Sequence, residues 1–110
     1  RLGVAMGGEP ATFAGLAGLG DLVLTCTGSL SRNRTVGVEI GQGRPVAEVL
    51  AGRETVAEGV VTTQSAHALA TARGVSMPIV AAMHRILFEG MAPRDAVQEL
   101  MARALRAEGD

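Results

Sequence analysis

The sequence has no tryptophan, tyrosine or lysine, and only two phenylalanines, Phe13 and Phe88, among its 110 residues. Large aromatic side chains supply much of the buried area in ordinary domains, so smaller aliphatic side chains and methionine must build this core. Alanine lets helices approach closely but buries little apolar area. We therefore expect a domain of modest stability that depends on a neighbouring part of the protein.

A single cysteine, Cys26, and the lack of long apolar runs exclude several protein classes. One cysteine cannot build a disulfide framework or a multi-cysteine metal site, and it favours a reducing, cytoplasmic location. We read Cys26 as a small buried hydrophobe. No run approaches the roughly 20 apolar residues that span a bilayer, and no signal peptide opens the chain. We therefore expect no stable membrane insertion.

The net charge argues against a protein that binds nucleic acid or anionic membranes, and the histidine spacing argues against a metal-binding protein. The formal net charge of -1 gives no general attraction to nucleic acid or anionic membranes, so any anion site must be local. His67 reads as exposed and His84 as a helix-flank residue. Neither has a second ligand at metal spacing, so we expect no metal.

Hydrophobic residues make up 47% of the chain and follow helical spacing, while strand alternation is almost absent. The sequence therefore predicts one all-α domain of six or seven helices over residues 1–110. Pro78 and Pro93 suit first helical turns, and Gly74 and Gly90 suit helix ends. The predicted helices cover Ser31–Ile40, Pro45–Leu50, Glu58–Arg73, Pro78 to the stop at Gly90, and Pro93 onward, after a broken, glycine-rich pair over Pro10–Cys26.

Apolar spacing also predicts the buried face of each longer helix. These faces are Val61, Ser65, Ala68, Leu69 and Ala72 on the first; Ile79, Val80, Met83, Ile86 and Leu87 on the second; and Ala96, Val97, Leu100, Met101, Ala104 and Leu105 on the last. The opening residues, Arg1–Met6, read as the end of a helix already under way. We therefore expect a piece of a longer protein.

The segment Gly15–Arg34 carries the chemistry. Three of its glycines precede one carboxylate, Asp21, and missing side chains let a ligand approach a backbone closely. Ten residues later, Ser31-Arg32-Asn33-Arg34 combines a helix start with guanidinium and amide donors, which suits an anion. Ordinary roles stay open, because Asp21 could cap a helix and the cationic cluster could be a solvated helix start.

Three further polar residues have two readings each. Thr25 and Thr27 could donate to a ligand or satisfy backbone groups. Glu58 could bind a ligand or be an ordinary acidic residue of a first helical turn. The glycines before Asp21 do not match the register of a dinucleotide-binding motif, so the chain does not contain its own dinucleotide fold.

Several sequence blocks together resemble the C-terminal domain of bacterial NAD(P)-dependent glycerol-3-phosphate dehydrogenases. The blocks are Gly15-Leu16-Ala17-Gly18-Leu19-Gly20-Asp21-Leu22, Leu24-Thr25-Cys26-Thr27, Leu30-Ser31-Arg32-Asn33-Arg34, Val56-Ala57-Glu58-Gly59, Met77-Pro78-Ile79 and Leu87-Phe88-Glu89-Gly90. The resemblance covers nearly the whole chain. It implies a helical domain like the C-terminal domain of 6-phosphogluconate dehydrogenase, closing over substrate beside an N-terminal Rossmann domain that this chain lacks.

The resemblance also implies roles for individual residues. The family interconverts sn-glycerol 3-phosphate and dihydroxyacetone phosphate with NAD or NADP, for glycerophospholipid synthesis. Its catalytic aspartate matches Asp21, its substrate-binding residues match Asp21, Thr25, Ser31, Arg32 and Asn33, and its cofactor-binding residues match Arg32, Val56 and Glu58. The family's proton-transferring lysine lies upstream, so this chain should be inactive by itself. The oligomeric state stays open, with a homodimer as one option.

Two other hypotheses remain at this point. The chain could be the helical domain of a related dehydrogenase with another small substrate, although Ser31, Arg32 and Asn33 favour a phosphorylated one. It could also be a stand-alone helical oligomerisation module. A pure packing module has no use for the glycine-rich run before Asp21, so we rank it below the enzymes.

Overall fold

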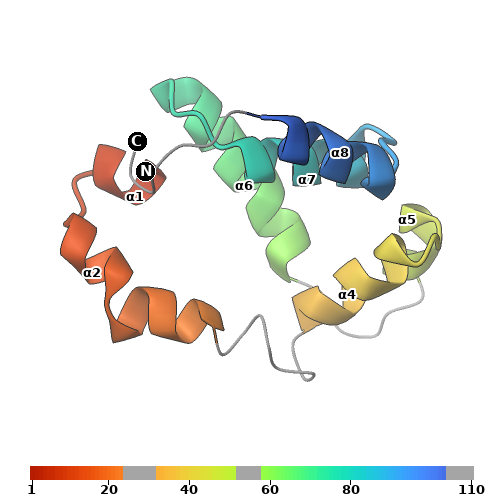
Figure 1. Cartoon of the computed structure of the whole chain (residues 1–110), viewed down its shortest axis with the longest axis horizontal. Helices are drawn as coiled ribbons and strands as arrows, with labels where there is room; N and C mark the ends of the chain where they lie inside the picture. The colour runs from red at the N-terminus through yellow and green to blue at the C-terminus, as the bar shows by residue number, and fades with distance from the viewer. Residues whose placement is uncertain (24–31, 52–57, 104–110) are drawn as a thin grey trace.

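The computed structural model describes residues 1–23, 32–51 and 58–103. Within these ranges every regular element is helical and no strand occurs, which confirms the predicted all-α class. The elements are α1 (Leu2–Ala5), α2 (Pro10–Ala14), η1 (Leu16–Gly20), α4 (Arg32–Gly41), α5 (Val46–Ala51), α6 (Glu58–Arg73), α7 (Pro78–Phe88) and α8 (Pro93–Ala102) (Figure 1). None of these described helices is long and apolar enough to cross a membrane.

Proline and glycine set the helix boundaries where the sequence predicted them. Proline occupies the first position of α7 and α8, where its missing N–H has no partner to lose. Gly74 (φ 65°) and Gly90 (φ 75°) follow α6 and α7 in the left-handed region, which glycine enters without a Cβ clash. Both predicted helix stops are therefore confirmed.

The helices α4 to α8, here called the helical bundle, hold the core. In the described part of the chain the buried side chains are all apolar, and all but one form a single cluster. They are Val36, Ile40, Val49, Ala70, Ala82, Ile86 and Ala96, with Ala70 outside the cluster. Three of them are alanines, as expected of a core that lacks aromatic side chains.

The face predicted for α6 is wrong. Its buried residue is Ala70, whereas Val61 keeps 59% of its surface exposed. Ser65, Ala68 and Ala72 are also exposed, and Leu69 is only half-buried. Alanine and threonine side chains occur on every side of α6 itself, so its sides are nearly equal in hydrophobicity. The contacts with α4 and α7 therefore decide which side is buried.

The faces predicted for α7 and α8 are partly confirmed. Ile86 and Ala96 are buried, and Val80, Met83, Leu87 and Leu100 are half-buried. The outer members of each stripe, Ile79 on α7 and Val97 and Met101 on α8, are 66%, 53% and 81% exposed. Each buried strip is narrower than its apolar stripe because the neighbouring helix covers only the centre. Ala104 and Leu105 lie outside the described residues.

The N-terminal arm, residues 1–23, contains α1, α2, η1 and one further helical turn. Glycines shape it: a Cβ on Gly3 would come within 2.3 Å of the Phe13 ring, and one on Gly8 within 2.7 Å. A Cβ on Gly18 would come within 2.1 Å of the Phe13 carbonyl oxygen. The arm therefore folds closely around one aromatic residue.

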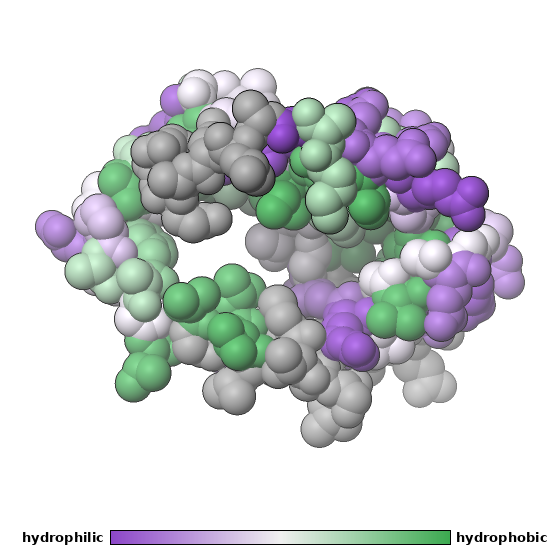
Figure 2. Space-filling model, in the orientation of Figure 1, coloured by the Kyte–Doolittle hydropathy of each residue, from purple (hydrophilic) through white to green (hydrophobic). Residues whose placement is uncertain are grey.

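One side-chain hydrogen bond joins the arm to the bundle region within the described ranges. The Arg1 side chain donates from Nε to the Ser76 carbonyl oxygen at 3.1 Å, between α6 and α7. In the space-filling view an open gap separates most of the arm from the bundle, and hydrophobic residues border it (Figure 2). No residue of the arm whose exposure is described is buried.

Candidate functional site

The predicted site residues lie at three helix ends. Asp21 is exposed on the turn that directly follows η1. Arg32 and Asn33 are exposed as the first two residues of α4, and Glu58 is exposed as the first residue of α6. The other three predicted positions, Thr25, Ser31 and Val56, lie outside the described residues, as do Cys26 and Thr27.

One hydrogen bond brings the starts of α4 and α6 together. The backbone N–H of Gly59 donates to Asn33 Oδ1 at 2.8 Å, across 26 positions of sequence. Figure 1 shows the first turns of these two helices side by side. The structure thus unites two predicted site residues, Asn33 and Glu58, that the sequence places far apart.

The local charges favour an anion at these helix starts. The N–H groups of a first helical turn have no partner within the helix, and a helix N-terminus carries roughly half a positive charge. Arg32 adds a guanidinium at the first position of α4, and Asn33 Nδ2 adds two neutral N–H donors. Glu58 adds one negative charge at the first turn of α6, where the helix dipole stabilises it. The two helix starts that the Asn33–Gly59 hydrogen bond joins therefore contribute one cationic and one acidic side chain.

Asp21 lies on the arm, apart from these groups. η1 is a single π-helical turn in a glycine-rich stretch, and such turns often occur at functional sites. Among the described residues, no hydrogen bond or ion pair joins the Asp21 side chain to Arg32 or Asn33.

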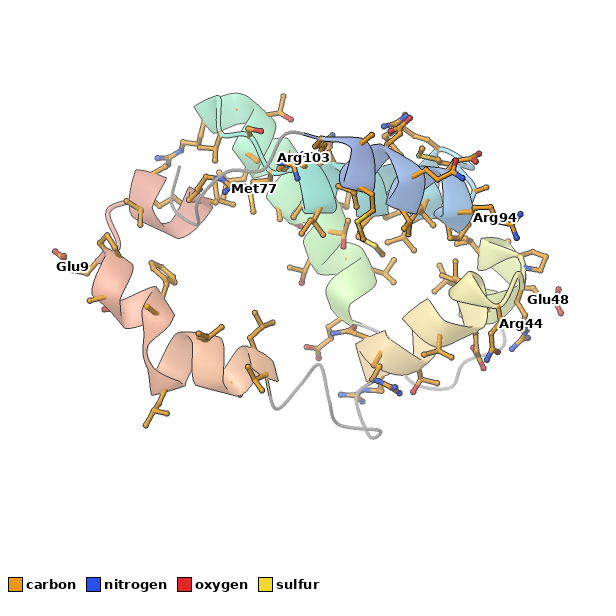
Figure 3. All side chains as sticks on the ribbon, in the orientation of Figure 1. Glu9, Arg44, Glu48, Met77, Arg94 and Arg103 are labelled. Atoms are coloured by element: carbon orange, nitrogen blue, oxygen red, sulfur yellow. The ribbon has the colours of Figure 1, made fainter. Side chains whose placement is uncertain are left out.

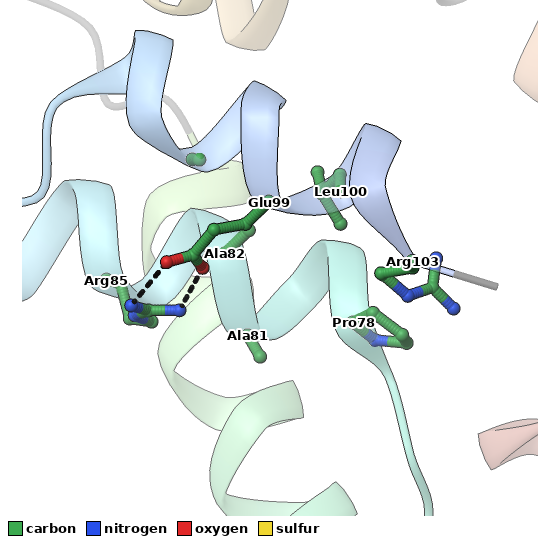
Figure 4. Close-up of a pocket in the computed structure, with 8 residues that line it drawn as sticks. Pro78, Ala81, Ala82, Arg85, Glu99, Leu100 and Arg103 are labelled. Atoms are coloured by element: carbon green, nitrogen blue, oxygen red, sulfur yellow. Dashed lines mark hydrogen bonds and ion pairs between the residues drawn. The ribbon is translucent and has the colours of Figure 1, made fainter.

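Two pockets formed by described residues contain none of the predicted site residues. One, of about 240 Å³ and lined by Pro78, Ala82, Arg85, Glu99 and Arg103 among others, lies between α7 and α8 (Figure 4). There Arg85 Nη1 donates to Glu99 at 2.8 Å, so this cation already has an anionic partner.

A second and larger pocket, of about 580 Å³, is mostly apolar and lies among α5, α7 and the turns beside them. Arg44 on its rim is 3.2 Å from Glu39 and 3.8 Å from Glu48 (Figure 3). Arg85 and Arg44 are therefore already paired with carboxylates. Three predicted site residues, Arg32, Asn33 and Glu58, lie instead at the exposed starts of α4 and α6, which we take as the candidate site.

The two histidines form a cluster of their own between α6 and α7. Their rings stack with centroids 4.1 Å apart, and His84 Nδ1 is 2.9 Å from Glu89 Oε2. The expectation of an exposed His67 is wrong, because the His84 ring covers one of its faces and leaves it half-buried. Within the described ranges no three His, Cys, Asp or Glu residues group as metal ligands.

Gly59 is the part of the site that the sequence prediction missed. A glycine in a first helical turn costs about 1 kcal/mol relative to alanine, and such a glycine often marks a close approach by another group. That signal was present in the Glu58-Gly59 pair. The sequence alone could not show that the approaching group is the side chain of Asn33.

Comparison with known proteins gives a consistent answer. The family model described as NAD-dependent glycerol-3-phosphate dehydrogenase C-terminus matches residues 1–98. The glycerol-3-phosphate dehydrogenases [NAD(P)+] of Citrifermentans bemidjiense and Koribacter versatilis are 62% and 61% identical over 109 residues. These alignments cover 99% and 98% of this chain but 32% of each relative, so the chain spans about a third of their length.

A solved structure agrees with the sequence matches. The crystal structure of glycerol-3-phosphate dehydrogenase from Coxiella burnetii superposes with a TM-score of 0.88 at 46% identity. The superposition covers 94% of this chain and 32% of the Coxiella burnetii chain. The resemblance identified from the sequence blocks is thereby confirmed. The chain belongs to the NAD-dependent glycerol-3-phosphate dehydrogenase family and corresponds to its C-terminal part.

Proposed function

We propose that residues 1–110 are the substrate-binding helical domain of an oxidoreductase that interconverts sn-glycerol 3-phosphate and dihydroxyacetone phosphate. NAD or NADP is the second reactant, and the product supplies glycerophospholipid synthesis. Family membership supports the activity. The observation that carries the binding role is the hydrogen bond that places Asn33 and the N-terminus of α6 together beside Arg32.

The phosphate of the substrate is the group that these helix starts suit. Arg32 can donate two parallel hydrogen bonds to phosphate oxygens, because its guanidinium is a planar fork. Asn33 adds a neutral donor, and the N-terminus of α4 adds backbone N–H groups. Thr25 and Ser31 complete the proposed substrate contacts with hydroxyl groups. Binding energy gained at the phosphate, remote from the reacting carbon, then holds the substrate in a reactive pose.

The reaction itself needs a proton and an orienting charge. In the reduction direction the nicotinamide supplies a hydride to the carbonyl carbon, and the carbonyl oxygen becomes negatively charged. A lysine outside this chain protonates that oxygen, and the Asp21 carboxylate orients the lysine ammonium. Because the chain has no lysine of its own, residues 1–110 alone lack this proton donor.

The cofactor contacts that this domain contributes are few. The chain has no nucleotide-binding glycine motif, so the preceding Rossmann domain holds most of the cofactor. Glu58, exposed at the start of α6, can accept hydrogen bonds from cofactor hydroxyl or amide groups. Arg32 is next to Asn33 in the chain, and we propose that it contacts both ligands. Val56 is the remaining proposed cofactor contact. We place the assembled enzyme in the cytoplasm, and a homodimer is one option for its assembly.

Kinetics of Arg32→Ala in the full-length enzyme test this proposal. We expect kcat/KM for dihydroxyacetone phosphate to fall about a hundredfold to a thousandfold, since a charge-assisted bidentate contact is lost. Arg94→Ala is the matched control, because Arg94 is an exposed arginine near the start of α8, away from the first turn of α4 (Figure 3). An Arg32→Ala enzyme as efficient as the Arg94→Ala enzyme would remove Arg32 from the site.

A further inference from the structure

The Asn33–Gly59 contact fixes which end of the Asn33 amide is free. An amide side chain carries one acceptor, Oδ1, and one donor group, Nδ2. Because Gly59 presents an N–H, only Oδ1 can face it, at the observed 2.8 Å. Flipping the amide would set two donors against each other. The orientation of Asn33 therefore follows from chemistry, and Nδ2 remains as its outward donor.

A further hydrogen bond fixes the backbone of Gly59, so Gly59 can determine the orientation of the Asn33 amide. Its carbonyl oxygen accepts a hydrogen bond from Thr63 Oγ1 at 2.6 Å. Its N–H belongs to the first turn of α6, where no partner exists within the helix. The Asn33 side chain therefore caps α6 from a different helix, and each group satisfies the other.

A side chain at Gly59 would displace the Asn33 amide. A Cβ there would lie 2.8 Å from Asn33 Oδ1 and 2.9 Å from its Cγ, closer than unbonded carbon and oxygen atoms pack. Any residue other than glycine would push the Asn33 amide away from the N–H that orients it. By contrast, a Cβ on Gly37 in α4 would meet nothing within 4 Å.

We propose that Gly59 is a positioning residue for phosphate recognition: its missing side chain and its N–H together lock Asn33 with Nδ2 as a donor toward the substrate phosphate. This inference rests on the proposed function, because it assigns Asn33 a phosphate. This fixed orientation of the Asn33 amide, here called the lock, excludes the flipped amide, whose oxygen would repel the phosphate dianion. Gly59 thus acts on substrate affinity through Asn33 and makes no contact with substrate itself.

Gly59→Ala in the full-length enzyme, with Gly37→Ala as control, tests the lock. We expect Gly59→Ala to raise KM for dihydroxyacetone phosphate about tenfold, the effect of one lost hydrogen bond to a charged group. Because the reacting groups are untouched, kcat should stay within about twofold. Gly37→Ala should change neither constant. An unchanged KM in a folded Gly59→Ala enzyme would overturn the proposal.

Two more variants separate this inference from the proposed function. Asn33→Asp keeps an oxygen for the Gly59 N–H but replaces the donor with a negative charge, so KM should rise by more than in Gly59→Ala. If Asn33→Asp raises KM and Gly59→Ala does not, the positioning role fails and the phosphate site stands. If Asn33→Asp and Arg32→Ala both leave KM unchanged, the proposed function fails.

Hydrogen exchange of the Gly59 amide covers the case in which Gly59→Ala does not fold. In the wild-type enzyme this amide owes its protection to Asn33 alone, because it has no partner within α6. Asn33→Ala should therefore speed its exchange about tenfold or more, with amides in the middle of α6 unaffected. Equal exchange at Gly59 in both proteins would show that the contact is absent and would overturn the lock.

Discussion

The arm and the bundle contain similar kinds of side chain but bury them very differently. In the bundle, valine, isoleucine and alanine side chains reach exposures of 2–8%. In the arm, Leu16 is 91% exposed and Leu19, Leu22 and Val23 are each more than half exposed. The bundle supplies its own hydrophobic core, whereas the arm leaves apolar area that another part of the protein must cover.

The two regions also divide the proposed chemistry. Asp21, the only proposed catalytic residue of this chain, is on the arm, while Arg32, Asn33 and Glu58 begin helices of the bundle. A carboxylate that must meet a lysine from outside the chain gains from a segment that packs against that outside part. Phosphate-binding groups gain from rigid helix starts. The boundary between the arm and the bundle therefore separates exposed from buried apolar side chains. It also separates the proposed catalytic residue from the proposed binding residues.

Asp21→Asn tests whether the arm serves catalysis and the bundle serves binding. We expect kcat of the full-length enzyme to fall about a hundredfold, or about 2.7 kcal/mol, because the lysine loses its orienting charge. KM for dihydroxyacetone phosphate should change little, in contrast to Arg32→Ala. Steady-state kinetics with both variants give the comparison. A change in KM without a change in kcat would assign Asp21 to substrate binding, like the residues of the bundle, and would contradict its catalytic role.

Two isoleucines on α7 test how far burial differs within the bundle. Ile86 is 8% exposed and Ile79 is 66% exposed. Ile86→Ala should lower the free energy of unfolding by about 2–3 kcal/mol, through lost burial and a residual cavity. Ile79→Ala should change it by less than about 0.5 kcal/mol. Urea unfolding of both variants measures the difference, and equal losses would mean that Ile79 is covered.

Gly18 and Gly15 test whether the arm has a specific fold of its own. A Cβ on Gly18 meets the Phe13 backbone at 2.1 Å, whereas one on Gly15 meets only carbonyl oxygens at 3.6 Å. Gly18→Ala should therefore destabilise the arm by about 1–2 kcal/mol, and Gly15→Ala should be tolerated. Hydrogen exchange of arm amides reports this. Identical protection in the two variants would show that the arm does not pack on Phe13.

Much of the fold could be predicted from local signals. Pro78, Pro93, Gly74 and Gly90 mark helix boundaries through their own backbone restrictions, which hold in any tertiary context. The buried face of α6 could not be predicted, because alanines and threonines on all its sides give no clear apolar stripe. Ala70 is buried because neighbouring helices approach it, and the sequence of α6 does not record that approach.

The candidate site divides in the same way. Residue type and spacing singled out Arg32, Asn33 and Asp21 but left ordinary structural roles open. The resemblance to a known family then implied their roles in the site. The contact between Asn33 and Gly59 joins residues 26 positions apart, and no local pattern encodes it. What the sequence could not supply was therefore the reason why Gly59 has no side chain.

The buried alanines have one more consequence, for how the bundle tolerates change. Ala70, Ala82 and Ala96 have almost no side chain left to delete, so truncation at these sites removes little. Enlargement is different, since each added methyl group would push two helices apart and force strain into their neighbours. Ala96, at 2% exposure, is beside the loop that leads from α7. We therefore expect substitutions that enlarge these three alanines to be rarer in functional proteins than substitutions that shorten the larger aliphatic core residues.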